Sequence, residues 1–356
     1  MKIIHCADLH LASALGTSLS AEKARTRRSE LLIQFKKMIE YAQQNGVSCI
    51  IIAGDLFDAS AVPLRTAEHV FDMMRGASDI QFLYLRGNHD CAGLTPDAEN
   101  ILVVPQDGKW VYTDVGGVTV ALCDVLEGQT DYPETLSLPE GCINIAVLHG
   151  EVRPTGKSEG SKIALTDFKN KHISYLALGH YHSYFTDVLD DGGVYCYSGC
   201  LEGRGFDECG KKGFVLLEIG EESFTYDFIP FSLRTLHDVV VDVTDCTSMP
   251  QIESAVTAKL SSVSSEDMVR LTLTGALPAE VNRDMEYLSK LLQGRFFAAR
   301  VHDKTTLLID PADYAGDASL KGAFVGGVLE SDLSEEEKQR VLSLGLAMLL
   351  GGEVNV

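Results

Sequence analysis

The sequence lacks the features that mark membrane, secreted and fibrous proteins. No apolar run approaches the ~18 residues that a membrane-spanning helix needs. No apolar core of a signal peptide, about seven residues long at least, precedes the first polar motif at Asp8 and His10. The chain also has no low-complexity tract and no internal repeat at the periods of solenoid proteins. These absences predict a soluble, cytoplasmic, globular protein without a membrane partner.

Cysteine motifs and positive charge are scarce as well. The nine cysteines are irregularly spaced and form no C-x-x-C motif, which argues against a structural zinc site. Several of them, such as Cys49, Cys142 and Cys196, adjoin apolar stretches, which favours buried, reduced thiols. The chain has 30 Lys and Arg residues against 51 Asp and Glu, so its net charge is -21. This acidity is an objection to a nucleic-acid partner, which usually needs a basic surface.

Apolar strands alternate with amphipathic helices through the first 230 or so residues, which predicts an α/β fold. A helix is expected from Ser20, its N-cap, to Asn45, with Gly46 as the stop. The almost wholly apolar run 47–53 predicts a strand that is buried on both faces. After Trp110, short strands with Gly-rich turns predict a second sheet packed on the first; the last of these strands is 213–219.

Pro230 marks an expected domain boundary. We expect a catalytic domain over 1–230, a small α/β capping domain over 231–315 and a short helical tail over 316–356. The capping domain is predicted from a strand, helix, strand, helix and strand over 236–243, 248–260, 269–274, 279–292 and 296–301. The tail is predicted to contain two short helices between 319 and 350.

Five short segments each follow an apolar strand and consist of metal-ligand residue types. They are Asp8-Leu9-His10, Gly54-Asp55, Gly87-Asn88-His89-Asp90, His149-Gly150 and Gly179-His180-Tyr181-His182. Side chains at the carboxyl ends of strands converge on one crevice in an α/β sheet. The paired ligands are two residues apart, which places them on one face of an extended chain, and the glycines permit close approach of the loops. Each segment alone is weak evidence, but their order predicts a metal centre.

The ligand types indicate which chemistry such a centre performs. Mixed His, Asp and Asn ligands suit Mn²⁺, Fe²⁺ or Zn²⁺ better than Ca²⁺. Two divalent ions ~3.5–4 Å apart can clamp the attacking and leaving oxygens of a phosphoryl displacement. Their charge exceeds that of Asp8 and Asp55, which suits an anionic phosphate and lowers the pKa of a bridging water. Histidine is the one side-chain type whose unperturbed pKa lies near neutrality, which makes His89 a candidate proton donor to a leaving oxygen.

The order of these motifs resembles that of the calcineurin-like metallophosphoesterase superfamily over roughly residues 1–219. The resemblance implies a four-layer α-β-β-α sandwich of two mixed sheets, with a small α/β cap domain and a short C-terminal helical tail. It implies two metal ions, one held by Asp8, His10, Asp55 and His182 and the other by Asp55, Asn88, His149 and His180, with Asp55 bridging. His89 would then act at the leaving oxygen as an acid or orienting group, with Asp90 beside it as a second catalytic residue.

Within this superfamily, the segments 4–11 and 54–58 resemble SbcD-like DNA-repair exonucleases, particularly the YhaO-like group, as does the loop 199–208. Asp58 stands where purple acid phosphatases carry a Tyr ligand and where some repair nucleases carry a His. The resemblance implies a Mn²⁺-dependent DNA exo- or endonuclease that acts in DNA repair. It also implies a homodimer and a tail that docks on a coiled-coil ATPase of the SbcC type.

Several alternatives stay open. The protein could be a phosphodiesterase or phosphatase of small molecules such as nucleotides, which the acidity favours, or a non-catalytic subunit whose tail anchors a partner. Arg204, Arg153 and Arg86 are expected to contact substrate phosphates, but each fits a structural ion pair equally well. The last helix is equally consistent with packing on its own domain and with docking on a partner; its apolar residues are Val341, Leu342, Leu344, Leu346, Met348, Leu349 and Leu350.

Overall fold

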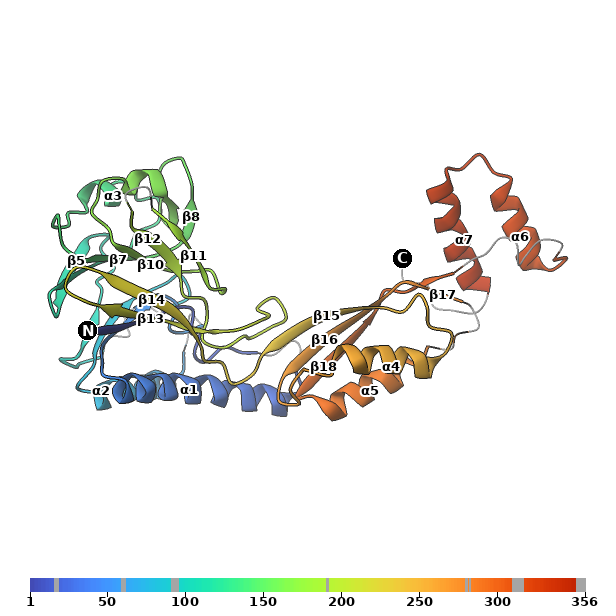
Figure 1. The fold of residues 1–356 in the computed structure, drawn as a ribbon, viewed down its shortest axis with the longest axis horizontal. Coiled ribbons are helices and arrows are strands. Elements are labelled where there is room, and N and C mark those ends of the chain that lie inside the picture. Colours follow the sequence, from blue (N-terminus) through green and yellow to red (C-terminus); the bar gives the residue numbers. More distant parts are fainter. Residues whose placement is uncertain are drawn as a thin grey trace. The chain divides into compact units, whose positions relative to one another are not determined.

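The structure, a computed structural model, divides into two compact units, Met1–Thr235 and Leu236–Val356 (Figure 1). It describes residues 1–15, 19–58, 62–90, 96–189, 192–278, 281, 283–308 and 317–349. The first unit contains every residue expected in the metal centre. The division falls close to the boundary expected at Pro230, while a separate tail after residue 315 stays a prediction.

The first sheet carries the strands that lead into three of the five motifs. Its parallel strands lie in the order β1 (Lys2–Cys6), β2 (Val47–Ala53), β3 (Gln81–Leu85) and β4 (Ile101–Val103). On the free side of β1, two antiparallel strands extend the sheet, β13 (Gly213–Ile219) and then β14 (Phe224–Pro230).

The prediction that 213–219 belongs to the second sheet is therefore wrong. Phe214 and Leu216 pack on the helix side of the first sheet, and Val215 and Leu217 pack between the two sheets. Because this strand is apolar on both faces, its own pattern does not indicate which sheet it joins.

The second sheet carries the other two motifs. Its order is β11 (Phe185–Val188), β12 (Val194–Tyr197), β10 (Tyr175–Gly179), β7 (Asn144–His149), β6 (Val118–Cys123) and β5 (Trp110–Val115). The four central strands are parallel, and the edge strands β5 and β11 are antiparallel to their neighbours. A short parallel pair, β8 (Glu151–Arg153) and β9 (Lys162–Ala164), follows β7.

The period-two alternation of buried side chains builds the layers. In β2, Ile50 and Ile52 pack with the helices α1 (Ala21–Gln44) and α2 (Leu64–Gly76), whereas Cys49 and Ile51 pack between the sheets. The outer face of the second sheet is covered by the short helix α3 (Tyr132–Thr135) and the 3-10 helix η1 (Leu165–Phe168). The expected four-layer sandwich of two mixed sheets is confirmed, with only short helices on the second sheet.

Helix α1 shows how closely local sequence determines an element here. The Ser20 hydroxyl accepts a hydrogen bond from the backbone N of Lys23 at 3.3 Å, which caps the first turn. The helix ends before Asn45, and Gly46 follows with φ 66°, a conformation that favours glycine. Both predicted ends of this helix are confirmed.

The cysteines bear out their expected burial only in part. Cys49 and Cys196 are buried in the core between the sheets, whereas Cys142 is exposed in the segment before β7. The prediction was wrong for Cys142 because its neighbours begin a strand only at Asn144, so the thiol precedes the buried part. Among the helices of the described part, none has the length and apolarity to cross a membrane.

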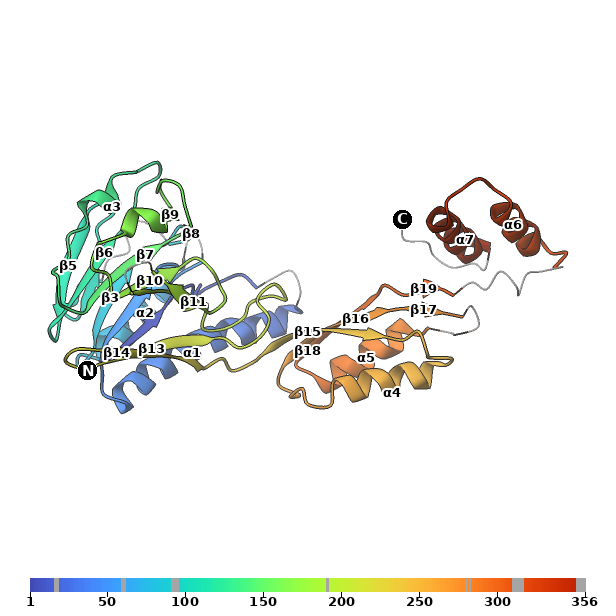
Figure 2. The same cartoon turned by 45° about the horizontal axis from the view of Figure 1, so that its top comes forward.

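The second unit begins with a parallel sheet of β15 (Leu236–Asp242), β16 (Met268–Thr274) and β18 (Ala298–Asp303). Helices α4 (Met249–Lys259) and α5 (Met285–Arg295) lie on one face of this sheet (Figure 2). The helix expected over 279–292 begins only at Met285, because the Asp284 carboxylate accepts from the backbone N of Tyr287 and caps it there. Residues 279, 280 and 282 lie outside the described residues.

The end of the chain holds a short parallel pair and two helices. The pair is β17 (Ala276–Leu277) with β19 (Thr306–Leu307), and the helices are α6 (Leu320–Leu329) and α7 (Glu335–Leu349). On α7, Leu342 and Leu346 are buried with Val325 and Val328 of α6. Other apolar residues of α7 are exposed: Val341, Leu344, Met348 and Leu349. Leu350 lies outside the described residues.

Candidate metal centre

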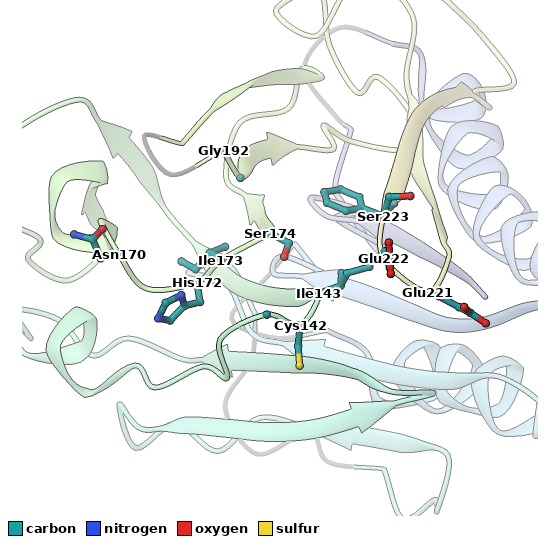
Figure 3. Close-up of a pocket in the computed structure, with 13 residues that line it drawn as sticks. Cys142, Ile143, Asn170, His172, Ile173, Ser174, Gly192, Glu221, Glu222 and Ser223 are labelled. Atoms are coloured by element: carbon teal, nitrogen blue, oxygen red, sulfur yellow. The ribbon is translucent and has the colours of Figure 1, made fainter.

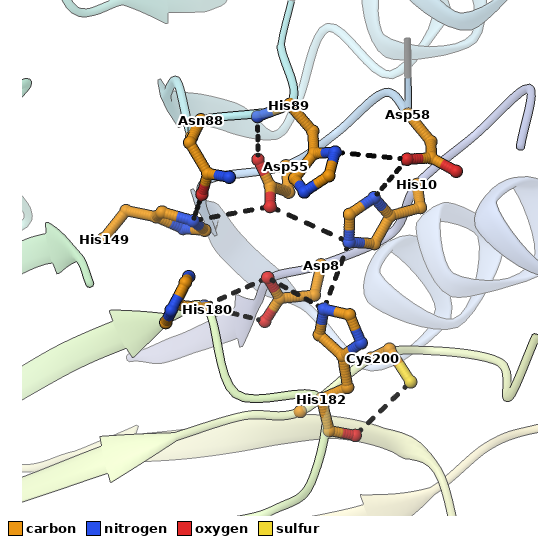
Figure 4. A network of polar contacts seen from close by, with 12 residues as sticks. Asp8, His10, Asp55, Asp58, Asn88, His89, His149, His180, His182 and Cys200 are labelled. Atoms are coloured by element: carbon orange, nitrogen blue, oxygen red, sulfur yellow. Dashed lines mark hydrogen bonds and ion pairs between the residues drawn. The ribbon is translucent and has the colours of Figure 1, made fainter. Parts of the chain in front are cut away.

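The polar residues of all five motifs meet at the carboxyl ends of β1, β2, β3, β7 and β10 (Figure 4). The loops after β1 and β2 are joined by two backbone hydrogen bonds, from Asp8 N to Gly54 O at 3.0 Å and from His10 N to Asp55 O at 2.9 Å. These backbone hydrogen bonds hold the first two motifs together without any contribution from their side chains.

The backbone of these loops is left-handed rather than extended. Asp8, His10 and Asp55 have φ of 52°, 45° and 53°, and His180 has φ 107°. The explanation of the paired ligands by an extended chain is therefore wrong for Asp8-Leu9-His10 and for His180. Left-handed backbone costs a non-glycine residue ~1–2 kcal/mol, so the fold stores strain at these positions.

Close approach of backbone also requires glycine at two of the motifs. A Cβ on Gly87 would overlap the Asp55 carboxylate, and a Cβ on Gly179 would overlap the carbonyl oxygen of Ala53 and the His149 ring. The expectation that glycines permit tight packing of these loops is confirmed at both positions.

Two groups of side chains lie at the centre of the cluster, and the ligand atoms within each are no more than 4.8 Å apart. The first consists of Asp8, His10 and His182; Nε2 of His10 and Nε2 of His182 are 3.2 Å apart. The second consists of Asp8, Asp55 and His149; Nε2 of His149 lies 3.4 Å from Oδ2 of Asp55. Asp55 Oδ2 is also 3.7 Å from Nε2 of His10, so this carboxylate lies between the two groups.

Asn88 and His180 adjoin the second group. Oδ1 of Asn88 lies 3.1 Å from Nε2 of His149. The backbone N of His180 donates to both oxygens of the Asp8 carboxylate at 3.0 Å, and its ring packs edge-on against His149. All seven residues expected as metal ligands are therefore in one cluster, although their assignment as ligands stays a prediction.

Burial gives the cluster unusual electrostatics. Burial raises the pKa of Asp8 to about 6 and lowers the pKa of His10 to about 3, with the nearby Arg204 cation lowering it further. Burial alone would raise the pKa of Asp55 and lower that of His149. Their mutual contact instead sets the pKa of Asp55 to about 2 and that of His149 to about 9.

This donor set fits divalent metal ions. Two imidazole nitrogens face each other between two carboxylates, and Nδ1 of the fully buried His10 has no hydrogen-bond partner among the described residues. Neutral imidazole, carboxylate and amide oxygen are ligands that suit Mn²⁺, Fe²⁺ or Zn²⁺. A cation between His10 and His182 would be bound by both Nε2 lone pairs when each ring carries its proton on Nδ1.

A third group contains the expected proton donor. Oδ1 of Asp58 lies 3.3 Å from Nδ1 of His89 and 3.4 Å from Nδ1 of His10. The His89 side chain is half exposed, and its backbone N donates to Oδ1 of Asp55 at 2.9 Å. The ring of His89 is therefore oriented by Asp58 beside the cluster while remaining open to solvent.

Asp90 holds the backbone of two neighbouring loops, and its expected catalytic role stays a prediction. Its carboxylate accepts hydrogen bonds from the backbone N of Phe57 at 2.8 Å, Gly87 at 3.0 Å and Leu56 at 3.2 Å. These contacts hold the loops after β2 and β3 together. The structure thus shows Asp90 positioning the backbone around Asp55 and His89.

The three arginines expected to contact phosphates differ in their surroundings. Arg204 makes hydrogen-bonded ion pairs with Glu208 and Asp58, and Arg86 is buried and donates to Val104 O at 3.0 Å. Arg153 is exposed and lies 3.6 Å from Glu151. Arg204 and Arg153 therefore both have the carboxylate partners of an ion pair, and the phosphate contacts expected of all three arginines stay predictions.

Sequence reasoning missed Glu208 as a residue of the centre. Its Oε1 lies 2.6 Å from Nδ1 of His182. The carboxylate lies at the end of the loop 199–208. In the sequence, only the resemblance to repair nucleases distinguishes this loop. No spacing rule connects it to a histidine on another strand.

Two hollows of the first unit differ in their position relative to the cluster. One of about 890 Å³ lies at the amino ends of β7 and β10, the opposite ends from the ligands, and Cys142, His172, Ser174 and Glu222 are among its lining residues (Figure 3). A smaller one of about 300 Å³ adjoins the centre, because Asn88 and His149 line it together with Arg86 and Asp124. Only the smaller hollow is placed to receive a substrate of the metal centre.

Comparison with known proteins identifies the class to which this fold and cluster belong. Residues 1–184 match the family model of the calcineurin-like phosphoesterases. The chain therefore belongs to the calcineurin-like phosphoesterase family, whose members are hydrolases that use two divalent metal ions.

Individual relatives are more distant. The chain is 28% identical to the uncharacterized metallophosphoesterase YhaO of Bacillus subtilis, over 78% of this chain and 72% of that protein. It is 25% identical to the DNA double-strand break repair protein Mre11 of Sulfolobus acidocaldarius, over 78% and 76%. A dimetal phosphatase structure from Danio rerio aligns with 64% of this chain and 95% of its own at 10% identity and TM-score 0.41, a likeness too low to bear on function.

Proposed function

We propose that this chain is a two-metal phosphodiesterase whose substrate is DNA, cut as an exo- or endonuclease during DNA repair in the cytoplasm. The observation that carries the proposal is the convergence of Asp8, His10, Asp55, His149 and His182 from the ends of four strands onto one cluster of ligand atoms. DNA as substrate is supported by the similarity to the repair protein Mre11 and by the motif resemblance to repair exonucleases.

In this proposal, two overlapping sets of residues bind the two metal ions. Asp8, His10, Asp55 and His182 hold one ion, and Asp55, Asn88, His149 and His180 hold the other. Asp55 is shared, which agrees with its position between the two groups. Mn²⁺ is the proposed metal, with Fe²⁺ or Zn²⁺ as substitutes. When bound, the two ions supply the positive charge that orients an anionic phosphoryl group for in-line displacement.

His89 is the proposed proton donor to the leaving oxygen. Its Nδ1 is held 3.3 Å from Asp58, so Nε2 is the ring nitrogen that carries the proton to be transferred. The backbone contact of His89 with Asp55 keeps the ring at a fixed place beside the cluster. Removal of such a group typically costs roughly 100- to 10,000-fold in rate.

A second candidate function has its own observation. The hollow beside Asn88 and His149 has a volume of about 300 Å³, which suits a small ligand. Oδ2 of Asp124 in its wall is buried without a hydrogen-bond partner among the described residues. With the net charge of -21, these features favour a phosphodiesterase of small molecules such as nucleotides.

In this proposal, the tail binds a partner protein. The exposed apolar side chains of Val341, Leu344, Met348 and Leu349 on α7 would dock on a coiled-coil ATPase of the SbcC type. The buried Leu342 and Leu346 meanwhile hold α7 to α6. A homodimer is proposed from the resemblance alone. A non-catalytic anchoring subunit is the third reading, and it requires that the metal cluster have no hydrolytic activity.

The test is hydrolysis by the purified protein with Mn²⁺ on labelled single- and double-stranded DNA, on a cyclic dinucleotide and on a p-nitrophenyl phosphodiester. We expect metal-dependent DNA cleavage that falls at least about 100-fold in His89→Asn. His69→Asn is the matched control, because His69 is an exposed histidine on α2.

Each other outcome has a distinct meaning. Turnover of only the small phosphodiesters would support the second candidate function, a phosphodiesterase of small molecules. The anchoring subunit would be established by two results together. The chain with its ATPase partner would hydrolyse none of these substrates, and His89→Asn would leave every activity of the complex unchanged.

A further inference from the structure

The loop between β12 and β13 packs around His182. Nδ1 of the His182 ring lies 2.6 Å from Oε1 of Glu208. The backbone carbonyl of His182 accepts from Nζ of Lys212 at 2.6 Å. It also accepts from Sγ of Cys200 at 3.4 Å (Figure 4). Glu208, Lys212 and Cys200 are all buried. Both the ring and the backbone of His182 are therefore held by buried groups of this loop.

Arg204 holds the Glu208 carboxylate in place. The backbone N of Arg204 donates to Oε2 of Glu208 at 2.7 Å, and Nη2 donates to Oε1 at 2.8 Å. The remaining arm of the guanidinium, Nη1, donates to Oδ2 of Asp58 at 3.2 Å. One arginine thus connects the carboxylate behind His182 to the carboxylate beside His10.

The two histidines have matching orientations. Nδ1 of His182 is hydrogen-bonded to Glu208, whereas Nδ1 of His10 lies 3.4 Å from Oδ1 of Asp58 without a hydrogen bond. The two Nε2 atoms are 3.2 Å apart. A neutral imidazole that carries its proton on Nδ1 presents the lone pair of Nε2 to a metal ion. A carboxylate on the other nitrogen fixes the tautomer and makes Nε2 a stronger ligand.

We propose that Glu208 and Arg204 are positioning residues of the metal centre: Glu208 fixes the ring of His182, and Arg204 clamps Glu208 and Asp58 so that His182 and His10 direct Nε2 to the same cation. This inference rests on the proposed function, because it takes both histidines to be metal ligands. It also assigns Arg204 a role in metal binding in place of the expected contact with substrate phosphate.

The test is calorimetric titration of metal-free protein with MnCl₂ for the wild type, Glu208→Ala and Glu208→Gln. We expect the affinity of one Mn²⁺ site to fall about 10- to 100-fold in Glu208→Ala. The loss in Glu208→Gln should be smaller, because the amide oxygen can still accept from Nδ1. Thermal unfolding of each metal-free variant shows whether it is folded at the titration temperature.

Glu202→Gln is the matched control. Glu202 is a buried carboxylate of the same loop that is also held by an arginine, Arg27 at 2.8 Å, and by the backbone N of Leu233. Its replacement is expected to lower the unfolding temperature while leaving both Mn²⁺ affinities unchanged. This variant separates a positioning role at the metal from a general role of a buried charge in folding.

Arg204→Lys and Arg204→Ala test the clamp. Lysine keeps the charge but lacks the fork that binds two carboxylates, so both variants should weaken Mn²⁺ binding, alanine more strongly. Weaker DNA binding at unchanged Mn²⁺ affinity would instead show a phosphate contact and overturn this part.

The failure of this inference is distinguishable from that of the proposed function. Wild-type affinities in folded Glu208→Ala and Glu208→Gln would overturn the inference alone. A wild-type protein that binds no Mn²⁺ would overturn both.

Discussion

The first unit buries two clusters of charged side chains, and the protein completes only one of them. Arg27, Glu30, Glu202 and Arg234 form a chain of ion pairs with N–O distances of 2.7 Å for Arg27–Glu30, 2.8 Å for Arg27–Glu202 and 2.7 Å for Arg234–Glu30. Two positive charges balance two negative ones. In the metal cluster, by contrast, the carboxylates of Asp8 and Asp55 face the imidazoles of His182, His149 and His10 at longer N–O distances of 3.9 Å, 3.4 Å and 3.7 Å.

The difference separates two uses of buried charge. Ion pairs that protein groups complete specify and hold the fold, since breaking one leaves an uncompensated charge. A cluster that protein groups leave incomplete carries strain and desolvation until a ligand of the right charge binds. The arginine cluster is therefore expected to control stability, and the metal cluster is expected to control function.

Of the changes that compare the two clusters, Asp55→Asn is expected to have the largest effect, because it removes the shared carboxylate of the metal cluster. We expect Mn²⁺ binding to be lost and hydrolysis to fall roughly 1,000-fold, because two-metal stabilisation contributes several kcal/mol. Thermal unfolding of the metal-free variant shows whether it is folded at the assay temperature. Hydrolysis within tenfold of the wild type would contradict the assignment.

Arg27→Met is expected to have the converse effect. Loss of the guanidinium leaves Glu30 and Glu202 buried without it, which should lower the free energy of unfolding by about 3–5 kcal/mol. Mn²⁺ affinity should not change. Urea unfolding and calorimetry measure the two quantities, with Arg25→Met, an exposed arginine on the same helix, as the control. A Mn²⁺ affinity that falls with stability would show that the clusters are coupled.

Metal removal should separate the clusters without mutation. Mn²⁺ at 100 times its dissociation constant should raise the free energy of unfolding by about 2.7 kcal/mol per site, and a chelator should reverse the gain. The increment should be retained in Arg27→Met and absent in Asp55→Asn. Equal increments in both variants would indicate that Mn²⁺ binds elsewhere.

The smallest effect is a pH dependence of the arginine cluster. Burial alone would raise the pKa of Glu30, but hydrogen bonds from Arg234 and Arg27 hold it below its usual value of 4.5. Since the folded pKa is the lower one, Glu30 contributes stability above about pH 4.5 that is lost as the pH falls through the folded pKa. The gap in unfolding free energy between wild type and Glu30→Gln should therefore narrow below pH 4.5. A gap that stays constant down to pH 3 would exclude this ionisation as the cause.

Local patterns predicted those parts of the molecule that local physics determines. The cap at Ser20, the stop at Gly46 and the apolar run of β2 were sufficient to place their elements. The metal cluster could be predicted because each ligand type follows a strand, and parallel strands end at one edge.

Long-range contacts limited the remainder. The place of β13 beside β1 depends on backbone pairing between residues about 200 positions apart, which its own apolar pattern does not encode. Glu208 contacts His182 and Arg204 contacts Asp58, both far away in the sequence, so no spacing rule identifies these two residues. The late start of α5 depended on a single capping carboxylate at Asp284.

The left-handed backbone at Asp8, His10 and Asp55 limits the transfer of this centre to another protein. Its ligand geometry is determined by main-chain torsions and crossing loops as much as by the identity of the side chains. An engineer who grafts the seven side chains onto another α/β scaffold would reproduce the inventory but not the placement, unless the recipient loops adopt the same torsions. The transferable unit is therefore the set of strand-end loops together with their glycines.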